Sequence, residues 1–256
     1  MSANLCNRYA GLAARVYDLD KPIGRSFGDV EFYTRRLEIC DGPVLEPAVG
    51  SGRVLVPLLE AGFDVTGFDA SAAMLDLCRA ACEARGLRAE LSVARFDDFS
   101  YATRFGAVVL PAGSFQLIAT AQEGLAALKR FHDHLQPGGR LILDLDPVSA
   151  VLAPPGPTRR WTDANGDLLT LAEERIDSDL LNQTVVSHLR YDLWTDGRLS
   201  ASELELFALR WWSVEEMRLA LGAAGFVDVI VSGGYEHGRL PRREDGVITF
   251  EARRPS

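Results

Sequence analysis

The sequence predicts an α/β fold with a mostly parallel sheet and an antiparallel insert in its second half. Up to the breaker APPGP at 153–157, short apolar runs alternate with helical patterns, which is typical of βαβ units. These runs are rich in Val, Ile and Leu, as expected for strands covered by helices on both faces. After the breaker, apolar and polar residues alternate with period two, which indicates antiparallel strands.

The first half of the chain predicts five buried strands, at 43–49, 64–70, 89–96, 105–113 and 140–146. Helical patterns between them predict helices at 53–61, 72–85 and 123–135. Ser71 is the expected N-cap of the second helix, and Gly62 and Gly86 are expected to end the first two. The segment PGG at 137–139 predicts a turn before the fifth strand.

The insert is expected to contain three strands, at 170–176, 184–194 and 198–211. The last two are joined by Asp196-Gly197, a hairpin turn signal. Ser213 and Glu216 form a capping box for a helix at 214–224. Two closing strands follow, at 226–234 and 246–254, so the insert is expected within the α/β domain, between its fifth and sixth strands.

Composition limits the partners of this chain. Its formal net charge of −9 disfavours nucleic acid and anionic membrane surfaces. The arginine pairs at 159–160, 242–243 and 253–254 are too short for a basic patch and are expected on solvated loops or the tail. No run of 18 apolar residues occurs, so we expect a cytoplasmic protein.

The cysteines and histidines do not indicate a metal site. Cys78 and Cys82 lie four residues apart in a helical pattern, and we expect reduced, buried thiols. His132 and His134 lie two apart on a predicted helix, point in different directions and are expected on the surface. We therefore expect no metal.

The most informative segment is LEPAVGSGRVLVPLLEAGFDVTGFDAS at 45–71. Gly50 and Gly52 allow a tight turn and close approach of a ligand, and the next helix presents free N–H groups. Asp69 ends the following strand, where its carboxylate would accept hydrogen bonds from ribose hydroxyls. The segment therefore predicts a site for a nucleoside.

Two residues distinguish between nucleoside ligands. Leu55 occupies the position where the dinucleotide fingerprint requires a third small residue. Glu46, at the strand end, would repel a pyrophosphate but could support an amino acid that carries a cationic sulfonium. The ligand implied is adenosine joined to methionine.

At this point the chain resembles the class I S-adenosylmethionine-dependent methyltransferases, in particular the bacterial enzymes that act on small molecules. The resemblance covers roughly residues 30–147 and includes the pattern E-x-x-x-G-x-G-R-V-L-x-P-L at 46–58. It implies a Rossmann-like sheet of seven strands, mostly parallel with the last strand antiparallel. It also implies that the chain is an enzyme and that its cofactor is S-adenosylmethionine.

The resemblance assigns cofactor roles to particular residues. Glu46, Ala48, Gly50 and Gly52 correspond to the loop around the methionine moiety, Asp69 to the ribose ligand, and Ala70 and Met74 to the flanks of the adenine. Relatives carry an adenine-binding Asp where this chain has Arg95, so Phe96 would keep a backbone contact and Asp97 is a candidate substitute. Ala48 stands where the family usually has Gly. Leu110, Pro111 and Ala112 correspond to the segment beside the methyl-bearing sulfur, and Ser114, Phe115 and Gln116 lead into the next helix.

The resemblance also implies how the chain is divided. Residues 8–24 resemble an amphipathic lid helix, in which Tyr17 would close over the methionine carboxylate or sulfur; the alternative is a packed Tyr with an exposed hydroxyl. We expect one domain with four parts: N-terminal lid helices at 1–40, a cofactor-binding core at 41–147, an antiparallel insert and substrate lid at 148–211, and a closing helix and strands at 212–256.

Methyl transfer is an in-line displacement, so we expect proximity catalysis without a metal. A base is needed only for an acceptor that is protonated. Asp144 and Asp146 end the fifth strand and are acceptor-site candidates, with loop-capping carboxylates as the alternative. The insert adds the candidates His188, Tyr191, Arg210, Trp211 and Trp212, for which simple packing is the alternative.

The acceptor itself is not determined by the sequence. An antiparallel lid after the fifth strand resembles those of aminosugar and glycine N-methyltransferases, which favours an amine over a phenol or a carboxylate. Two other functions stay open: a nucleotide-dependent oxidoreductase and a non-catalytic protein that binds S-adenosylmethionine. A homodimer also stays open.

Overall fold

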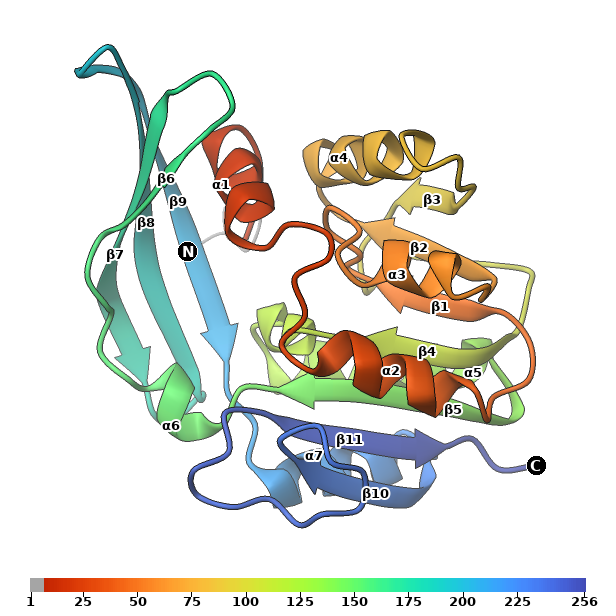
Figure 1. Ribbon diagram of the computed structural model, residues 1–256. Helices are drawn as coiled ribbons and strands as arrows, with labels where there is room; N and C mark the ends of the chain where they lie inside the picture. The colour runs from red at the N-terminus through yellow and green to blue at the C-terminus, as the bar shows by residue number, and fades with distance from the viewer. Residues whose placement is uncertain (1–6) are drawn as a thin grey trace.

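The computed structural model describes residues 7–256, which form two separate sheets (Figure 1). The larger sheet has seven strands in the order β10-β11-β5-β4-β1-β2-β3. Its strands are β1 (Val44–Pro47), β2 (Val65–Asp69), β3 (Glu90–Val93), β4 (Phe105–Leu110), β5 (Leu135–Leu145), β10 (Val227–Gly233) and β11 (Ile248–Arg253). β1 to β5 pair in parallel, and β11 runs antiparallel to β5 and β10. The predicted mostly parallel sheet is confirmed.

Helices cover both faces of this sheet, as its near-continuous apolar strands require. On one face lie α2 (Asp29–Leu37), α3 (Leu55–Glu60) and α4 (Ala72–Glu83), whose apolar residues share a buried cluster with β1 and β2. On the other lie α5 (Ala121–His134) and α7 (Val214–Ala223), which pack with Phe99, Phe105 and Phe250. The result is a three-layer core whose parallel strands β1, β2 and β4 end at the same edge.

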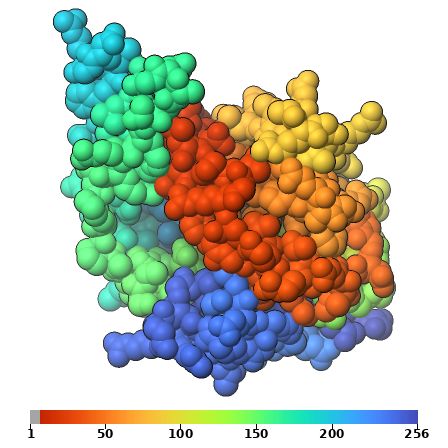
Figure 2. All heavy atoms as spheres, viewed as in Figure 1, coloured from red at the N-terminus to blue at the C-terminus, as the bar shows by residue number. Residues whose placement is uncertain are grey.

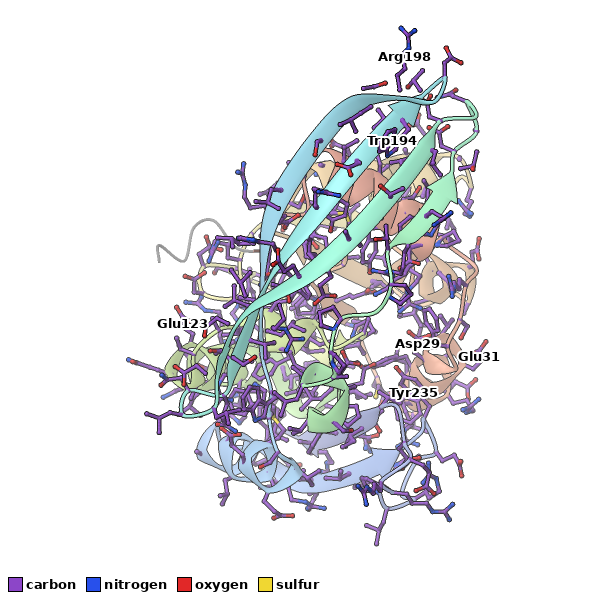
Figure 3. The ribbon with its side chains drawn as sticks, turned by 90° about the vertical axis from the view of Figure 1, so that its left-hand side faces the viewer. Asp29, Glu31, Glu123, Trp194, Arg198 and Tyr235 are labelled. Atoms are coloured by element: carbon purple, nitrogen blue, oxygen red, sulfur yellow. The ribbon has the colours of Figure 1, made fainter. Side chains whose placement is uncertain are left out.

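The second sheet is the predicted antiparallel insert, and it has four strands. They are β6 (Arg159–Thr162), β7 (Leu168–Asp179), β8 (Thr184–Thr195) and β9 (Arg198–Arg210), paired in that order and reached from β5 through the short helix α6 (Val148–Val151). The tip of the β8–β9 hairpin, marked by Trp194 and Arg198, extends away from the larger sheet (Figure 3). The insert lies in the chain between β5 and β10, the fifth and sixth strands of the larger sheet, as predicted.

Helix α1 (Leu12–Asp20) packs between the insert and the core (Figure 2). Its residues Leu12, Ala13 and Val16 share a buried cluster with Leu169, Leu171, Leu189 and Tyr191 of the insert. The preceding residues 7–11, here called the N-terminal strap, bridge the two parts of the molecule. Tyr9 donates its N–H to Glu205 of β9 (2.9 Å), while its carbonyl accepts a hydrogen bond from the Ser71 hydroxyl at the start of α4 (2.7 Å).

Several expectations about individual segments are wrong. The turn after β1 continues through Arg53, so the helix predicted from 53 begins at Leu55. The PGG segment at 137–139 lies inside β5, where the pairing shifts between Phe105 and Ala107 of β4. Arg159 and Arg160 lie on β6 rather than on a loop, and Arg159 pairs with Asp20 of α1 (3.0 Å).

His134 is buried, although a surface position was expected. Its Nδ1 donates to the carbonyl of Arg130 (2.8 Å), and its Nε2 accepts the N–H of Tyr101 (3.3 Å). Cys40, Cys78 and Cys82 carry free thiols, whereas Cys6 lies outside the described residues. Within residues 7–256, every helix is too short or too polar to span a bilayer.

Candidate active site

A cavity of about 390 Å³ lies where β1, β2 and β4 end, beneath the N-terminal strap, α1 and β9. This volume is in the range of small-ligand pockets. The residues that line it come from four regions of the chain: Asn7, Tyr9, Tyr17 and Lys21; Ala48, Gly50, Phe68, Asp69, Ala70, Met74 and 94–97; 112–114, 117–119 and Glu123; and Asp146 with 207–209. The core and the insert therefore build the cavity together.

The turn after β1 forms one wall, and its conformation explains its small residues. Ala48, Gly50 and Gly52 have positive φ angles of 53°, 59° and 88°. A Cβ on Gly50 would lie 3.3 Å from Met74 Cε, and a Cβ on Gly52 would lie 2.7 Å from Cys78 Sγ. Side chains at these positions would close the cavity or push α4 away, so the turn requires glycine.

Asp69 fixes this turn against the start of α4. Its two carboxylate oxygens accept the N–H of Gly50 (2.9 Å) and the N–H of Ser71 (2.8 Å). Burial raises the pKa of the Asp69 carboxyl. A carboxylate offers about four acceptor positions, so Asp69 can still accept two hydrogen bonds from a ligand in the cavity.

Glu46 lies below the turn and is almost completely buried, with 1% of its surface exposed. Its Oε2 has no hydrogen-bond partner among the described residues. Burial raises the pKa of the Glu46 carboxyl well above its ordinary value, and the Arg53 guanidinium only partly opposes this effect. Arg53 itself forms a buried ion pair with Asp29. Glu46 is therefore an unsatisfied acceptor beneath the turn.

The structure places nine of the fourteen expected cofactor residues on the cavity wall: Tyr17, Ala48, Gly50, Asp69, Ala70, Met74, Phe96, Asp97 and Ala112. The other five, Glu46, Gly52, Leu110, Pro111 and Phe115, are buried behind the wall. Phe115, for example, packs against Trp212 with ring centroids 5.5 Å apart. These five would support the site rather than contact a ligand.

Of the two acceptor candidates at the end of β5, Asp146, which follows its last residue, faces the cavity. Its backbone is held by the buried amide of Gln116, which accepts the Asp146 N–H (2.8 Å) and donates to its carbonyl (3.3 Å). Within residues 7–256 its carboxylate makes no hydrogen bond or ion pair. Burial raises the pKa of the Asp146 carboxyl, and the Lys21 ammonium partly offsets the effect.

Asp144 does not reach the cavity, which differs from our expectation. Only 1% of its surface is exposed, and its carboxylate accepts hydrogen bonds from the N–H of Gly113 (2.7 Å) and the hydroxyl of Tyr235 (2.9 Å). Regular alternation would place Asp144 and Asp146 on the same face, but β5 ends at Leu145, so Asp146 lies beyond the strand and is free to point into the cavity. Alternation along the strand gave no indication of which one faces the cavity.

The candidates from the insert also lie outside the cavity wall. Tyr191 packs under α1, and His188 is half-buried elsewhere on β8. Arg210 donates to Gln183 (2.7 Å) and lies 3.9 Å from the centroid of the Trp212 ring, while Trp211 packs with Val151 and Val185. The insert instead contributes 207–209 of β9.

Sequence reasoning missed Asn7, Tyr9 and Lys21, which line the cavity beside Tyr17. Their positions depend on contacts between segments far apart in the chain. The side chain of Asn7, for example, pairs with the backbone of Ala208, donating to its carbonyl (2.9 Å) and accepting its N–H (2.9 Å). No local pattern indicates such contacts, although the proximity of Tyr9 and Lys21 to Tyr17 in sequence was a weak signal.

Comparison with known proteins identifies the family. Residues 44–139, which include the turn, Asp69 and β4, match the family model described as a methyltransferase domain. The chain belongs to the class I S-adenosylmethionine-dependent methyltransferases. The oxidoreductase alternative is not supported. In the part of this methyltransferase that the structure describes, no group of three or more His, Cys, Asp or Glu side chains is arranged to hold a metal.

Two relatives and one solved structure illustrate the similarity. This methyltransferase is 32% identical to a dTDP-3-amino-3,6-dideoxy-alpha-D-glucopyranose N,N-dimethyltransferase from Streptomyces fradiae, over 53% of this chain and 54% of the relative. It is 27% identical to a glycine/sarcosine N-methyltransferase from Aphanothece halophytica, over 83% of this chain and 77% of the relative. The CcbJ methyltransferase from Streptomyces caelestis has the same fold, with a TM-score of 0.77 and 22% identity over 97% of this chain and 98% of the other.

Proposed function

We propose that this methyltransferase methylates an amine nitrogen of a small molecule and needs no metal to do so. The observation that carries the proposal is the carboxylate of Asp146, which faces the cavity just after β5, beside the turn at 111–114, and has no hydrogen-bond or ion-pair partner among residues 7–256. A carboxylate in this position favours an acceptor that carries N–H groups or positive charge. The two relatives described above, by their names, act on an amino sugar and on glycine or sarcosine.

The residues of the cavity fit S-adenosylmethionine. Gly50 leaves space that a Cβ would fill, and Tyr17 and Ala48 border the same space, so this end would hold the methionine part. Asp69 has acceptor positions for the ribose hydroxyls. Met74 and Phe96 would contact the adenine, and Glu46 would place an unpaired carboxyl oxygen below the cationic end.

The main task of the protein in this reaction is to position the acceptor nitrogen beside the methyl group. S-adenosylmethionine, when bound, supplies an electrophilic methyl group, which an acceptor nitrogen takes in an in-line displacement that leaves S-adenosylhomocysteine. Holding a nucleophile about 3–3.5 Å from the carbon that it attacks can supply on the order of 7–11 kcal/mol. We propose that Asp146 does this for the nitrogen by accepting one of its N–H groups.

Asp146 can also remove a proton from the acceptor. An amine that is protonated in solution has no lone pair to attack with, so a nearby carboxylate that accepts its proton favours the reactive form. Desolvation by the surrounding residues raises the pKa of the Asp146 carboxyl, which makes it a better proton acceptor than an aspartate with an ordinary pKa. The insert would close over the acceptor as a substrate lid, through 207–209 of β9.

The test is release of S-adenosylhomocysteine from purified protein, S-adenosylmethionine and a panel of small amines, phenols and carboxylic acids. We expect turnover with amines and a loss in kcat/KM of about tenfold or more in Asp146→Asn, because a hydrogen bond to a charged group contributes about 1.5–3 kcal/mol. Affinity for S-adenosylmethionine should change little.

Asp228→Asn is the matched control, because Asp228 is an exposed residue of β10 that pairs only with Arg253 among the described residues. Turnover confined to phenols or acids, or an Asp146→Asn variant as active as the control, would contradict the amine proposal. Binding of S-adenosylmethionine without turnover of any compound in the panel would instead favour the non-catalytic alternative.

A further inference from the structure

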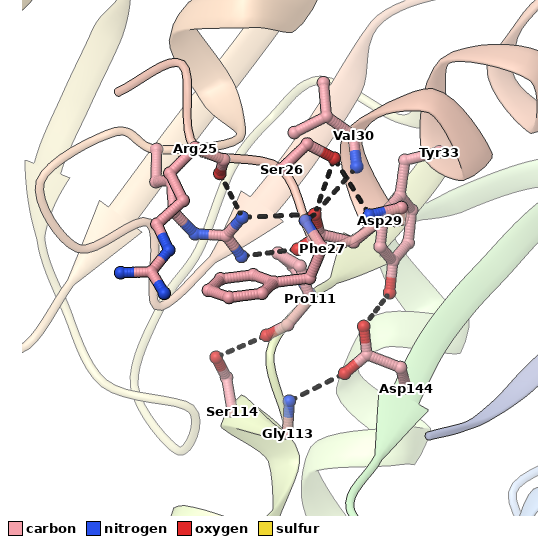
Figure 4. A network of polar contacts seen from close by, with 12 residues as sticks. Arg25, Ser26, Phe27, Asp29, Val30, Tyr33, Pro111, Gly113, Ser114 and Asp144 are labelled. Carbon is pink, nitrogen blue, oxygen red and sulfur yellow. Dashed lines mark hydrogen bonds and ion pairs between the residues drawn. The ribbon is translucent and has the colours of Figure 1, made fainter. Parts of the chain in front are cut away.

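We propose that Asp144 is a positioning residue that holds the turn at 111–114 against the cavity and loosens it when the carboxylate takes up a proton. Asp144 lies behind the cavity wall, and Ala112, Gly113 and Ser114 lie on that wall. Figure 4 shows the contact between Asp144 and Gly113. The contact between Asp144 and the turn does not depend on the proposed function. The effect of this contact on methyl transfer rests on the proposed function.

The turn is one that needs an external contact. Ala112 and Gly113 have consecutive positive φ angles of 60° and 67°. For a non-glycine residue such as Ala112 this conformation costs roughly 1–2 kcal/mol. Inside the turn, the Ser114 hydroxyl donates to the carbonyl of Pro111 (2.7 Å). The contact that ties the turn to the sheet is the hydrogen bond from the Gly113 N–H to Asp144 Oδ1 (2.7 Å).

The tyrosines around Asp144 allow two arrangements of protons. The Tyr33 hydroxyl lies 3.1 Å from Asp144 Oδ2 and 3.1 Å from the carbonyl of Leu110, but it has a single proton. When Asp144 is ionised, Tyr33 and Tyr235 both donate to the carboxylate. When Asp144 is protonated, it donates to Tyr33, which then donates to Leu110. Both arrangements use the observed distances, so a proton can enter without rearrangement of the three side chains.

The titratable groups near Asp144 come from helix α2 and from the loop after β10. Helix α2 contributes Tyr33 and Asp29, the loop after β10 contributes Tyr235, and Asp29 is neutralised by Arg53. Burial raises the pKa of Asp144 to about 6, against the opposing effect of the Gly113, Tyr235 and Ala112 donors. The carboxylate therefore changes charge close to neutral pH.

The charge determines how firmly the turn is held. A hydrogen bond to an ionised acceptor is roughly twice as strong as one between neutral groups. Above the pKa, Asp144 therefore holds Gly113 firmly, and below it the hold weakens. Because Gly113 lies beside Asp146 and on the cavity wall, we expect the acceptor to bind less well to the protein in which Asp144 is protonated.

The experiment is an NMR titration of the Gly113 amide in the ligand-free protein, from about pH 5 to about pH 8. We expect the amide signal to shift with a midpoint near pH 6 in the wild type, and Asp144→Asn to abolish this inflection. Tyr235→Phe removes a donor that favours the ionised form, so its midpoint should move to higher pH. Tyr101→Phe is the matched control, because Tyr101 bonds to Ser92 away from this network, and its midpoint should equal that of the wild type.

A flat Gly113 signal in the wild type, or the same midpoint in Asp144→Asn or Tyr235→Phe, would overturn the proposal. The Tyr235→Phe arm decides the matter even where Asp144→Asn fails to fold. For catalysis, the KM of the acceptor should rise several-fold below the midpoint in the wild type but not in Asp144→Asn, whose neutral amide mimics the protonated acid. Because the titration needs no ligand, an inflection without methyl transfer would contradict the proposed function alone.

Discussion

Ala48 shows how a single residue in the turn after β1 affects both fold and site. It lies between β1 and Gly50 with a φ angle of 53°, which glycine adopts without strain and alanine does not. The sequence motif predicted a tight turn here, and the structure has one. The strain is local, so one substitution can relieve it.

We predict that Ala48→Gly increases the free energy of unfolding by about 1 kcal/mol, because it removes the penalty of a left-handed alanine. Urea denaturation followed by circular dichroism measures the change. Ala61→Gly is the matched control, since Ala61 follows α3 with a φ angle of −77° and should be destabilised by the same substitution. Equal loss of stability in both variants would show that Ala48 is not strained.

At the scale of elements, the N-terminal strap and α1 depend on the insert. Gly11, the N-cap residue of α1, provides no side-chain cap, and the N–H of Leu12 is instead satisfied by Glu203 of β9 (2.8 Å). Helix α1 packs on β7 and β8 through its apolar face. Helix α1, which borders the cavity, is therefore capped by a residue that lies 191 positions away in the sequence.

We predict that Glu203→Ala loosens the strap and α1, because the loss of a helix cap costs about 0.5–2 kcal/mol. Hydrogen exchange measured by mass spectrometry should become faster in residues 7–20 and stay unchanged in β4 and β5. Glu174→Ala serves as the control, since Glu174 is an exposed residue of β7. Unchanged exchange in residues 7–20 would show that the contact does not hold α1.

The elements differ in how well the sequence predicts them. The parallel strands have apolar runs and the insert strands β7, β8 and β9 have a clear period of two, so each was predicted near its observed position. Strand β6 was missed because its four residues, RRWT, are short and largely polar. His134 was misplaced because the N–H of Tyr101 reaches it from a loop. Pairing across the chain, rather than local pattern, decides both cases.

The same distinction applies to the candidate site as a whole. The wall formed by the turn and Asp69 follows from spacing within one βαβ unit, which a sequence motif encodes. The roof consists of Asn7, Tyr9 and 207–209, and forms only when the strap meets β9. The choice between Asp144 and Asp146 depends on where β5 ends, because Asp144 lies inside the strand and Asp146 lies after it. A local sequence pattern does not predict these features, because they depend on contacts that form only in the folded molecule.

Across the whole molecule, the buried Asp144 makes stability depend on pH. Burial raises its pKa to about 6 in the folded chain, above the ordinary value of about 3.9 for an aspartate, so the folded state binds the proton more tightly than the unfolded state does. The contribution to stability is complete below the unfolded value and is lost as the pH rises through the folded value. Glu251, held by Arg36 and Arg140, has a lowered pKa and acts in the opposite direction.

We predict that the free energy of unfolding of the wild type, measured relative to Asp144→Asn, falls as the pH rises from about 4 to about 6, by up to about 2–3 kcal/mol. Urea denaturation of both proteins at several pH values tests this, and the difference isolates Asp144 from Glu251. A difference that stays constant over this range would show that Asp144 has an ordinary pKa in the folded protein.

The central claim is that the cavity lined by Gly50 and Asp69 binds S-adenosylmethionine. Calorimetric titration with this compound tests the claim most directly. We predict one binding site per chain in the wild type and an affinity lower by about tenfold or more in Asp69→Asn, which keeps the size of the side chain but removes the charge that accepts the ribose hydroxyls. No heat of binding in the wild type, or equal affinity in both proteins, would contradict the account.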